Sequence, residues 1–208
     1  WLKLQMADSL GICAGVRVEL PARMVWRAYR AVLQTKSIGS ASALDKEALT
    51  WRLMRLLPTL LERPSFEAVR GYLLRTPEGN AFHLCAKVAD LFDQYQVYRS
   101  DWLEHWAQGR AVLSSSAGGQ PLGAVPEAQR WQVELWQAVL EELTEEELSR
   151  SRFEVHQRFM QALKHDLSPQ VRAALPQRIT LFGTTHLPQQ TLQALAALSR
   201  HIPAVSYT

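Results

Sequence analysis

The chain has 208 residues, of which 47% are hydrophobic and 21% are charged, so it can bury a sizeable core as an ordinary globular protein does. Its formal net charge of +3 excludes a bulk polycation, and any affinity for nucleic acid must then come from a local patch. The two isolated cysteines predict free thiols in a reducing cytoplasm and exclude a disulfide framework, and no apolar run approaches the ~18 residues of a membrane span.

The first 43 residues are expected to place one strand between two helices. The chain starts at Trp1 without a methionine, and we expect it to be a piece of something longer. Residues 1–10 predict the end of a helix, which the glycines of residues 11–15 break. Residues 16–20 alternate with period two, which predicts a short strand. Pro21 then suits the first turn of a helix that should run to about Leu33.

A helical block is expected from residue 44 onward. Asp45 is the predicted N-cap of a leucine-rich helix that Pro58 should kink or divide. Thr144 is the predicted N-cap of an acidic first turn. The Gly- and Ser-rich stretch around residues 107–126 predicts a flexible connection. Further helices are predicted at residues 66–74, 82–96, 127–143 and 153–167, with Pro176 ending the helical section.

The tail predicts a return to alternating strand and helix. Residues 178–182 and 202–207 have strand composition and flank an amphipathic helix at 187–199, which is typical of a parallel sheet. The expected fold class is therefore α/β and predominantly helical. It divides into a partial core at residues 1–43, a helical insertion at 44–175, and a return to the core at 176–208.

One helix, predicted at residues 82–96, carries a polar stripe between apolar faces. His83, Lys87, Asp90 and Gln94 recur at i, i+4, i+7 and i+11, Asp93 flanks them, and Arg99 follows the helix end. These charges fit a solvated ion-pair cluster, which contributes little stability. They can also form a recognition surface, because carboxylates, Gln and Arg can all bond base edges or phosphates, but the ion-pair cluster is the simpler interpretation. The residues alone leave both interpretations open.

Catalytic constellations are missing from the sequence. It has no G-x-x-x-x-G-K-[ST] phosphate loop, no Cys/His set with metal spacing, and no carboxylate pair singled out for acid–base work. The tryptophans Trp102 and Trp106, at i and i+4, predict core packing, with stacking on bases as the alternative.

Several segments carry a resemblance to a known family. They are, in chain order, LPARMVWRAYRAVL, WRLMRLLPTLLER, LFDQYQVYRSDWLEHW, EAQRWQVELWQAVL, VHQRFMQAL and LFGTTHLPQQTLQALAALSRHI. Together they resemble RecC, the gamma subunit of the RecBCD helicase–nuclease (exonuclease V), over nearly the whole chain, with the clearest gap at about residues 107–125.

The resemblance implies part of a degenerate helicase-like core of the P-loop type, which has lost its ATP-binding motifs, with a large helical insertion. It implies a noncatalytic role in double-strand break repair by homologous recombination, in a cytoplasmic heterotrimer with RecB-like and RecD-like subunits. ATP and Mg would be used by those partners, not by this chain. Single-stranded DNA would pass through the subunit, which reads Chi, a short DNA sequence that changes how the enzyme cuts.

The family's Chi-reading positions carry over to two short segments and one arginine. They imply as DNA-binding residues Leu20, Trp26, Asp90, Leu91, Asp93, Gln94, Arg99 and Arg152. The apolar members would be platforms for bases and the polar members would supply hydrogen bonds. A purely structural scaffold and an active helicase or nuclease fragment remain the competing interpretations.

Overall fold

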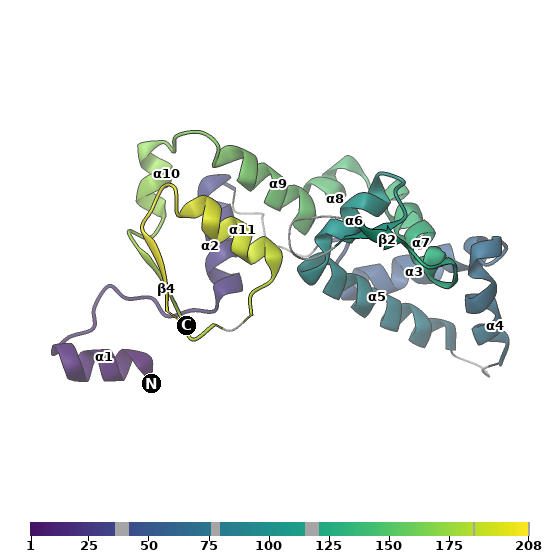
Figure 1. Ribbon diagram of the computed structural model, residues 1–208, viewed down its shortest axis with the longest axis horizontal. Coiled ribbons are helices and arrows are strands. Elements are labelled where there is room, and N and C mark those ends of the chain that lie inside the picture. Colours follow the sequence, from purple (N-terminus) through teal and green to yellow (C-terminus); the bar gives the residue numbers. More distant parts are fainter. Residues whose placement is uncertain (36–41, 76–79, 115–120, 185, 208) are drawn as a thin grey trace.

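The computed structural model describes residues 1–35, 42–75, 80–114, 121–184 and 186–207. Their buried apolar side chains form two separate hydrophobic clusters. We call the body around the first cluster, from residues 42 to 149, the helical block, and the body around the second the terminal core. Figure 1 shows the two bodies side by side, with α9 (Arg152–Ala162) leading from the helical block into the terminal core.

The terminal core is built on a parallel strand–helix–strand unit. Strands β3 (Ile179–Phe182) and β4 (Ala204–Tyr207) pair in parallel, joined by α11 (Gln189–Leu198). This confirms the predicted tail. Helices α2 (Pro21–Val32) and α9 pack against α11 and against each other. Pro21 occupies the first turn of α2, as its fixed φ and missing N–H favour.

A short helix in the terminal core was not predicted from the sequence. The predicted helix at 153–167 ends at Ala162, and α10 (Pro169–Ala174) follows it. The local signal was present, because Ser168 accepts a hydrogen bond from Val171 N at 3.3 Å and Pro169 opens the helix. Buried residues of both helices belong to the terminal core. The predicted boundary at residue 175 remains a prediction, although this packing groups residues 152–174 with the tail.

The predicted strand at residues 16–20 is wrong. The segment lies in irregular structure after α1 (Leu2–Leu10), whose last residue precedes Gly11 in the left-handed region at φ 77. Val16 and Val18, on one face of the alternation, are both exposed. A period-two pattern makes a strand only where one face is buried and a neighbouring strand pairs with it.

The helical block is organised on two long helices. Helix α3 (Lys46–Leu60) packs along α5 (Asn80–Tyr98), and both contact further helices, including α6 (Ser100–Ala107) and α7 (Arg130–Glu141). Pro58 does not divide the helix, since α3 continues to Leu60, and a kink at Pro58 stays a prediction. Pro58 stands in the last turn, so it removes one hydrogen bond where the helix is about to end. Helix α4 (Glu67–Arg75), after a 3-10 turn at Pro64–Phe66, confirms the predicted short helix.

Part of the predicted flexible connection is a β-hairpin. Strands β1 (Val112–Ser114) and β2 (Pro121–Ala124) pair antiparallel, and the connecting residues 115–120 lie outside the described part of the chain. Two tryptophans of α6 fix the first strand. Trp102 Nε1 donates to Ser114 O and Trp106 Nε1 to Val112 O, both at 3.1 Å. Trp106 is 2% exposed, which confirms the core interpretation for it.

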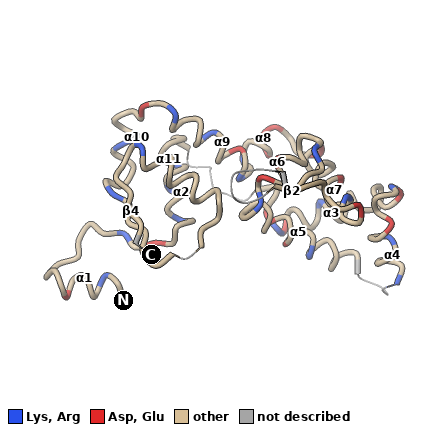
Figure 2. Tube along the Cα trace, viewed as in Figure 1, with Lys and Arg blue, Asp and Glu red and all other residues tan. Residues whose placement is uncertain are grey.

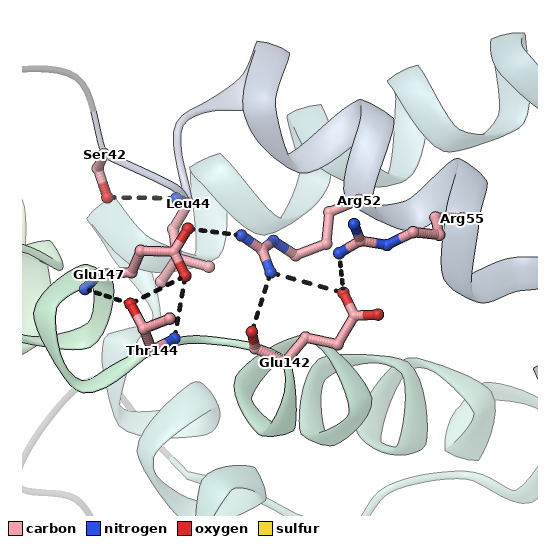
Figure 3. Close-up of polar contacts among 7 residues, drawn as sticks. All are labelled: Ser42, Leu44, Arg52, Arg55, Glu142, Thr144 and Glu147. Atoms are coloured by element: carbon pink, nitrogen blue, oxygen red, sulfur yellow. Dashed lines mark hydrogen bonds and ion pairs between the residues drawn. The ribbon is translucent and has the colours of Figure 1, made fainter.

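Charged side chains close one side of the helical block. Figure 3 shows Arg52 of α3 reaching Glu142 at 3.5 Å and Glu147 at 2.9 Å, while Arg55 reaches Glu142 at 2.6 Å. Glu147 belongs to α8 (Glu145–Ser149), and it forms a reciprocal capping box with Thr144. The predicted N-cap is therefore confirmed, and it turns the chain from α7 toward α9.

Candidate nucleic-acid interface

The polar stripe of α5 meets the start of α3 at the edge of the helical block. Asp90 accepts a hydrogen bond from Lys46 Nζ at 2.6 Å and another from Gln94 Nε2 at 3.2 Å. His83, Lys87 and Gln94 are exposed, so this side of α5 faces solvent as the sequence predicts. The ammonium of Lys46, through its hydrogen bond and its charge, lowers the pKa of the Asp90 carboxyl. Asp90 is therefore held as an anion that only accepts hydrogen bonds.

The start of α9 completes this group of side chains from the other body. Arg152 lies 3.3 Å from Asp93 of α5 and 3.9 Å from Asp45 at the start of α3. Arg152 and Asp93 are each about one-third exposed. We call these residues the junction cluster: Asp45, Lys46, Asp90, Asp93, Gln94 and Arg152. It brings together four of the predicted site residues, Asp90, Asp93, Gln94 and Arg152, from two elements far apart in the sequence.

Two members of the junction cluster were not predicted as site residues. Asp45 was identified only as an N-cap, and it does precede α3 with extended backbone angles. Its carboxylate makes no cap bond to the helix and instead accepts from Ser42 N at 2.7 Å. Lys46 lies 44 residues from Asp90 in the sequence, so no local pattern could have paired the two.

Arg99 has a different setting from the other polar candidates. Its guanidinium donates to the carbonyl of Ser114 and to Asp101 at 3.3 Å, and its Cζ lies 3.8 Å from the ring centroid of Trp102. These contacts tie the end of α5 to α6 and the β-hairpin. Arg99 itself lies just past the end of α5, at φ −138 and ψ 42, and is not part of the junction cluster.

The apolar candidates are distributed over both bodies. Leu20 immediately precedes α2, and its side chain is 71% exposed, which suits a contact surface better than a core. Trp26 is half-buried against the terminal core, with its ring 5.4 Å from that of Tyr29 in an edge-to-face arrangement. Leu91 is half-buried on α5, one residue after Asp90. The structure thus leaves part of each platform candidate accessible.

A cavity of about 340 Å³ lies next to the junction cluster, between the two bodies. It is lined mainly by apolar surface, with contributions from α5, α6, α7 and the start of α9. Leu44 and Ser151 line it, and their chain neighbours Asp45 and Arg152 belong to the junction cluster. Helix α11 contacts α5 here, so the junction between the bodies combines apolar packing with an ionic rim.

The remaining titratable groups of the described residues do not form a metal or nucleophile site. Within the described ranges, no three His, Cys, Asp or Glu side chains are grouped closely enough to hold a metal ion. Burial raises the pKa of the Cys85 thiol to about 11, so it is a protonated core residue at neutral pH. His156 is buried and hydrogen-bonded on both nitrogens, by Tyr29 at 2.7 Å and by Gln193 at 3.0 Å. None of the described helices has the length and apolar character needed to cross a membrane.

Comparison with known proteins gives a consistent family. The family model described as "RecC, N-terminal domain" matches residues 1–207. The chain is 39% identical over 204 residues to the RecBCD enzyme subunit RecC of Escherichia coli K12, covering 97% of this chain and 17% of that protein. It is 33% identical over 214 residues to the Haemophilus influenzae subunit, covering 97% and 19%. It is 25% identical over 213 residues to that of Mycolicibacterium smegmatis, covering 97% and 16%. The chain thus spans less than a fifth of the length of these relatives.

Proposed function

The chain belongs to the RecC N-terminal domain family, and from this premise we propose that it is a noncatalytic DNA-recognition part of a RecBCD-type helicase–nuclease. In this role it guides an unwound single strand and takes part in reading Chi during recombinational repair. RecB-like and RecD-like partner subunits supply the ATP- and Mg-dependent chemistry. The parallel β3–α11–β4 unit is then part of a degenerate helicase-like core, from which the helical block rises as an insertion.

The observation that carries this proposal is the composition of the junction cluster. It presents acceptors on Asp90 and Asp93, both acceptor and donor groups on Gln94, and a guanidinium on Arg152, all at least partly exposed. These are the groups that bond exocyclic amines of cytosine and adenine, or guanine and phosphate. The pairs Asp90–Lys46 and Asp93–Arg152 orient both carboxylates from neighbouring helices. An oriented acceptor discriminates between bases better than a freely rotating one.

The apolar candidates would add stacking contacts with bases to the hydrogen bonds of the junction cluster. Single-stranded bases gain affinity by stacking on apolar and aromatic faces, which act without regard to sequence. Exposed Leu20 and the accessible part of Trp26 suit that role on the terminal core, and Leu91 suits it on α5. Arg99 supports the surface by holding the end of α5 to α6, and its side chain is 20% exposed, which leaves only part of the guanidinium for phosphate.

The test compares Gln94→Ala with Gln157→Ala in the full-length subunit assembled with its partners. Both residues are exposed glutamines on helices, but Gln157 lies on α9 outside the junction cluster. We expect Gln94→Ala to leave unwinding unchanged and to weaken or relax cutting at Chi by roughly 1–3 kcal/mol of discrimination, as the loss of one base contact does. Gln157→Ala should leave both unchanged. A Gln94→Ala complex that unwinds normally and responds fully to Chi would refute the proposed reading role.

A structural scaffold is the second candidate function. It is favoured by the fact that Asp90, Asp93 and Arg152 each have an oppositely charged partner within the chain. In that case Asp93→Ala should impair assembly of the complex, measured by size-exclusion chromatography, before it affects the response to Chi. ATP hydrolysis by the full-length subunit without its partners would instead revive the interpretation as an active helicase.

A further inference from the structure

The two bodies carry opposite net charge. Residues 42–149, the helical block, contain 10 Lys and Arg against 16 Asp and Glu. Residues 1–35 and 150–208 together contain 12 Lys and Arg against 4 Asp and Glu. The small net charge of the whole chain therefore combines an acidic block with a basic terminal part. Such asymmetry is a physical signal for a polyanionic partner, even where the total charge is modest.

Basic residues of the terminal core gather at the end of its sheet where both strands begin. Arg178 directly precedes β3, and Arg200 lies between α11 and β4. His201 Nε2 is hydrogen-bonded to the carbonyl of Leu163 at 2.9 Å, which brings the end of α11 to the end of α9 and to Lys164. Because β3 and β4 are parallel, their first residues lie at the same end of the sheet. Blue segments surround α10 and the α9–α10 connection in Figure 2. We call this surface the basic end: Lys164, Arg172, Arg178 and Arg200.

The cations of the basic end are available to a partner. All four side chains are exposed, and among the described residues none of them forms an ion pair with a carboxylate. This contrasts with Arg27 and Arg152 of the same body, which pair with Glu19 and with Asp93. Asp166 is the one acidic residue of the segment 163–178. Unpaired cations held on one end of a rigid body repel each other and attract a polyanion.

The chemistry of the basic end fits phosphate better than a protein surface. Guanidinium groups bind phosphate oxygens through paired hydrogen bonds, and three of the four cations are arginines. Protein interfaces instead centre on buried aromatic and apolar anchors. Within the described residues, none of the exposed large hydrophobic side chains falls in segments 163–178 or 199–203. The surface offers charge without an apolar centre.

We propose that the basic end binds the phosphodiester backbone of a nucleic-acid strand without regard to its sequence. The proposal rests on the proposed function, because it assigns to this end phosphate contacts beyond the single guanidinium, that of Arg152, which the junction cluster offers. Aspartates of the junction cluster repel phosphates, and a reading site of that kind needs positive surface close by. Helix α9 links the two surfaces, with Arg152 at its first turn and Lys164 just past its end. Its 11 residues separate them by about 16 Å.

The test removes three charges from each body in turn. The variant Arg172→Gln/Arg178→Gln/Arg200→Gln is compared with Arg63→Gln/Arg110→Gln/Arg130→Gln, which takes three exposed arginines from the helical block. Both are made in the full-length subunit within its assembled complex, and thermal melts check that folding is unchanged. Fluorescence anisotropy then follows binding of a labelled single strand and a labelled duplex, both lacking Chi, over a range of salt concentrations.

The basic-end variant should bind the oligonucleotide more weakly, and its affinity should depend less steeply on salt concentration. Each lost contact should reduce the log–log salt slope by about 0.7 for a single strand or about 0.9 for a duplex, so three contacts reduce it by about 2 to 3. The oligonucleotide whose slope changes identifies the bound form. The control variant should keep its slope on both.

Two outcomes overturn the proposal. Slopes that stay unchanged on both oligonucleotides show that no phosphate is bound here, and loss of a partner subunit on size-exclusion chromatography shows that the surface is a protein interface. The response to Chi is a separate readout. A changed slope with Gln94→Ala fully responsive to Chi would sink the proposed reading function and leave the basic end standing.

Discussion

In the helical block the turn between α7 and α8 is held by charged groups near the surface, whereas three helices of the terminal core are joined by neutral groups inside. In the block, Arg52 and Arg55 of α3 hold Glu142 and Glu147 at the turn between α7 and α8 (Figure 3). In the terminal core, one buried imidazole joins three helices. His156 of α9 bonds Tyr29 of α2 on one nitrogen and Gln193 of α11 on the other.

The two kinds of tie have different energetic consequences. A charged side chain near the surface that loses its partner is solvated by water, so its pair contributes little to stability. A buried polar group that loses its partner has no water to replace it and suffers the full desolvation penalty. The comparison teaches that the buried hydrogen bonds of His156 in the terminal core should tolerate substitution less well than the surface ion pairs of the helical block. The junction cluster between the bodies is of the tolerant kind, which leaves it free to serve recognition.

The largest expected effect concerns apolar packing in the helical block. Phe92 of α5 is fully buried, with its ring 5.3 Å from that of Trp136. Phe92→Ala should lower the free energy of unfolding by about 3–5 kcal/mol, the usual cost of truncating a buried phenylalanine. Chemical denaturation of the purified chain measures it. Phe82→Ala, at a position about half exposed, is the matched control and should cost far less. Equal losses for both would mean that charged ties, not packing, hold the block.

Tyr29→Phe tests the neutral tie of the terminal core. With Gln193 Oε1 as the acceptor, His156 Nε2 carries the proton, and Nδ1 accepts from the Tyr29 hydroxyl. Removing that hydroxyl leaves the buried nitrogen without a donor and should cost about 1–3 kcal/mol. Tyr98→Phe, on an exposed tyrosine of α5, is the control and should be nearly neutral. If Tyr29→Phe leaves the free energy of unfolding unchanged, the buried hydrogen bonds of the terminal core are no more sensitive to substitution than the surface ion pairs of the helical block.

The same imidazole predicts a pH dependence of stability. Burial lowers the pKa of His156 from its ordinary value of 6.5. As the pH falls through about 6.5, His156 binds a proton in the unfolded chain, but in the folded chain it does so only at a lower pH. Stability should therefore be complete above pH 6.5 and decrease as the pH falls from there toward the folded pKa. Denaturation curves between pH 5 and 7 measure this decrease, and it should disappear in His156→Gln. A stability that rises on acidification in this window would contradict the burial argument.

Most of the fold could be predicted because its elements carry local signals. The tail has β-branched strands around an amphipathic helix, Thr144 has its capping partner three residues away, and the apolar faces of α5 follow helical spacing. The misses have equally physical causes. Residues 16–20 have the period of a strand but pair with no strand among the described residues. The β1–β2 hairpin lies in a Gly- and Ser-rich stretch, and its first strand is held by Trp102 and Trp106.

The candidate site could be predicted only in part. The spacing on α5 identified Asp90 and Gln94 as neighbours on one solvent-facing stripe. No local pattern could show that Arg152, 59 residues after Asp93, would approach it from another helix. Arg99 lies close to this stripe in sequence, but its contacts with Ser114 and Trp102 direct it elsewhere. Tertiary contacts, which a helical period does not encode, decide which polar residues share a surface.

The smallest expected effect on stability is at the junction cluster itself. Arg152 and Asp93 lie 3.3 Å apart, each about one-third exposed, so their attraction competes with hydration of both groups. A double-mutant cycle of Arg152→Met and Asp93→Asn should give a coupling free energy below about 1 kcal/mol, and salt should reduce it further. A larger coupling free energy would mean that this pair stabilises the fold as a buried interaction does, which would favour the scaffold function. A small coupling, together with an altered response to Chi in either single variant, would separate recognition from stability at the same residues. Because the pair joins α9 to α5, the outcome also measures how firmly the terminal core is held against the helical block.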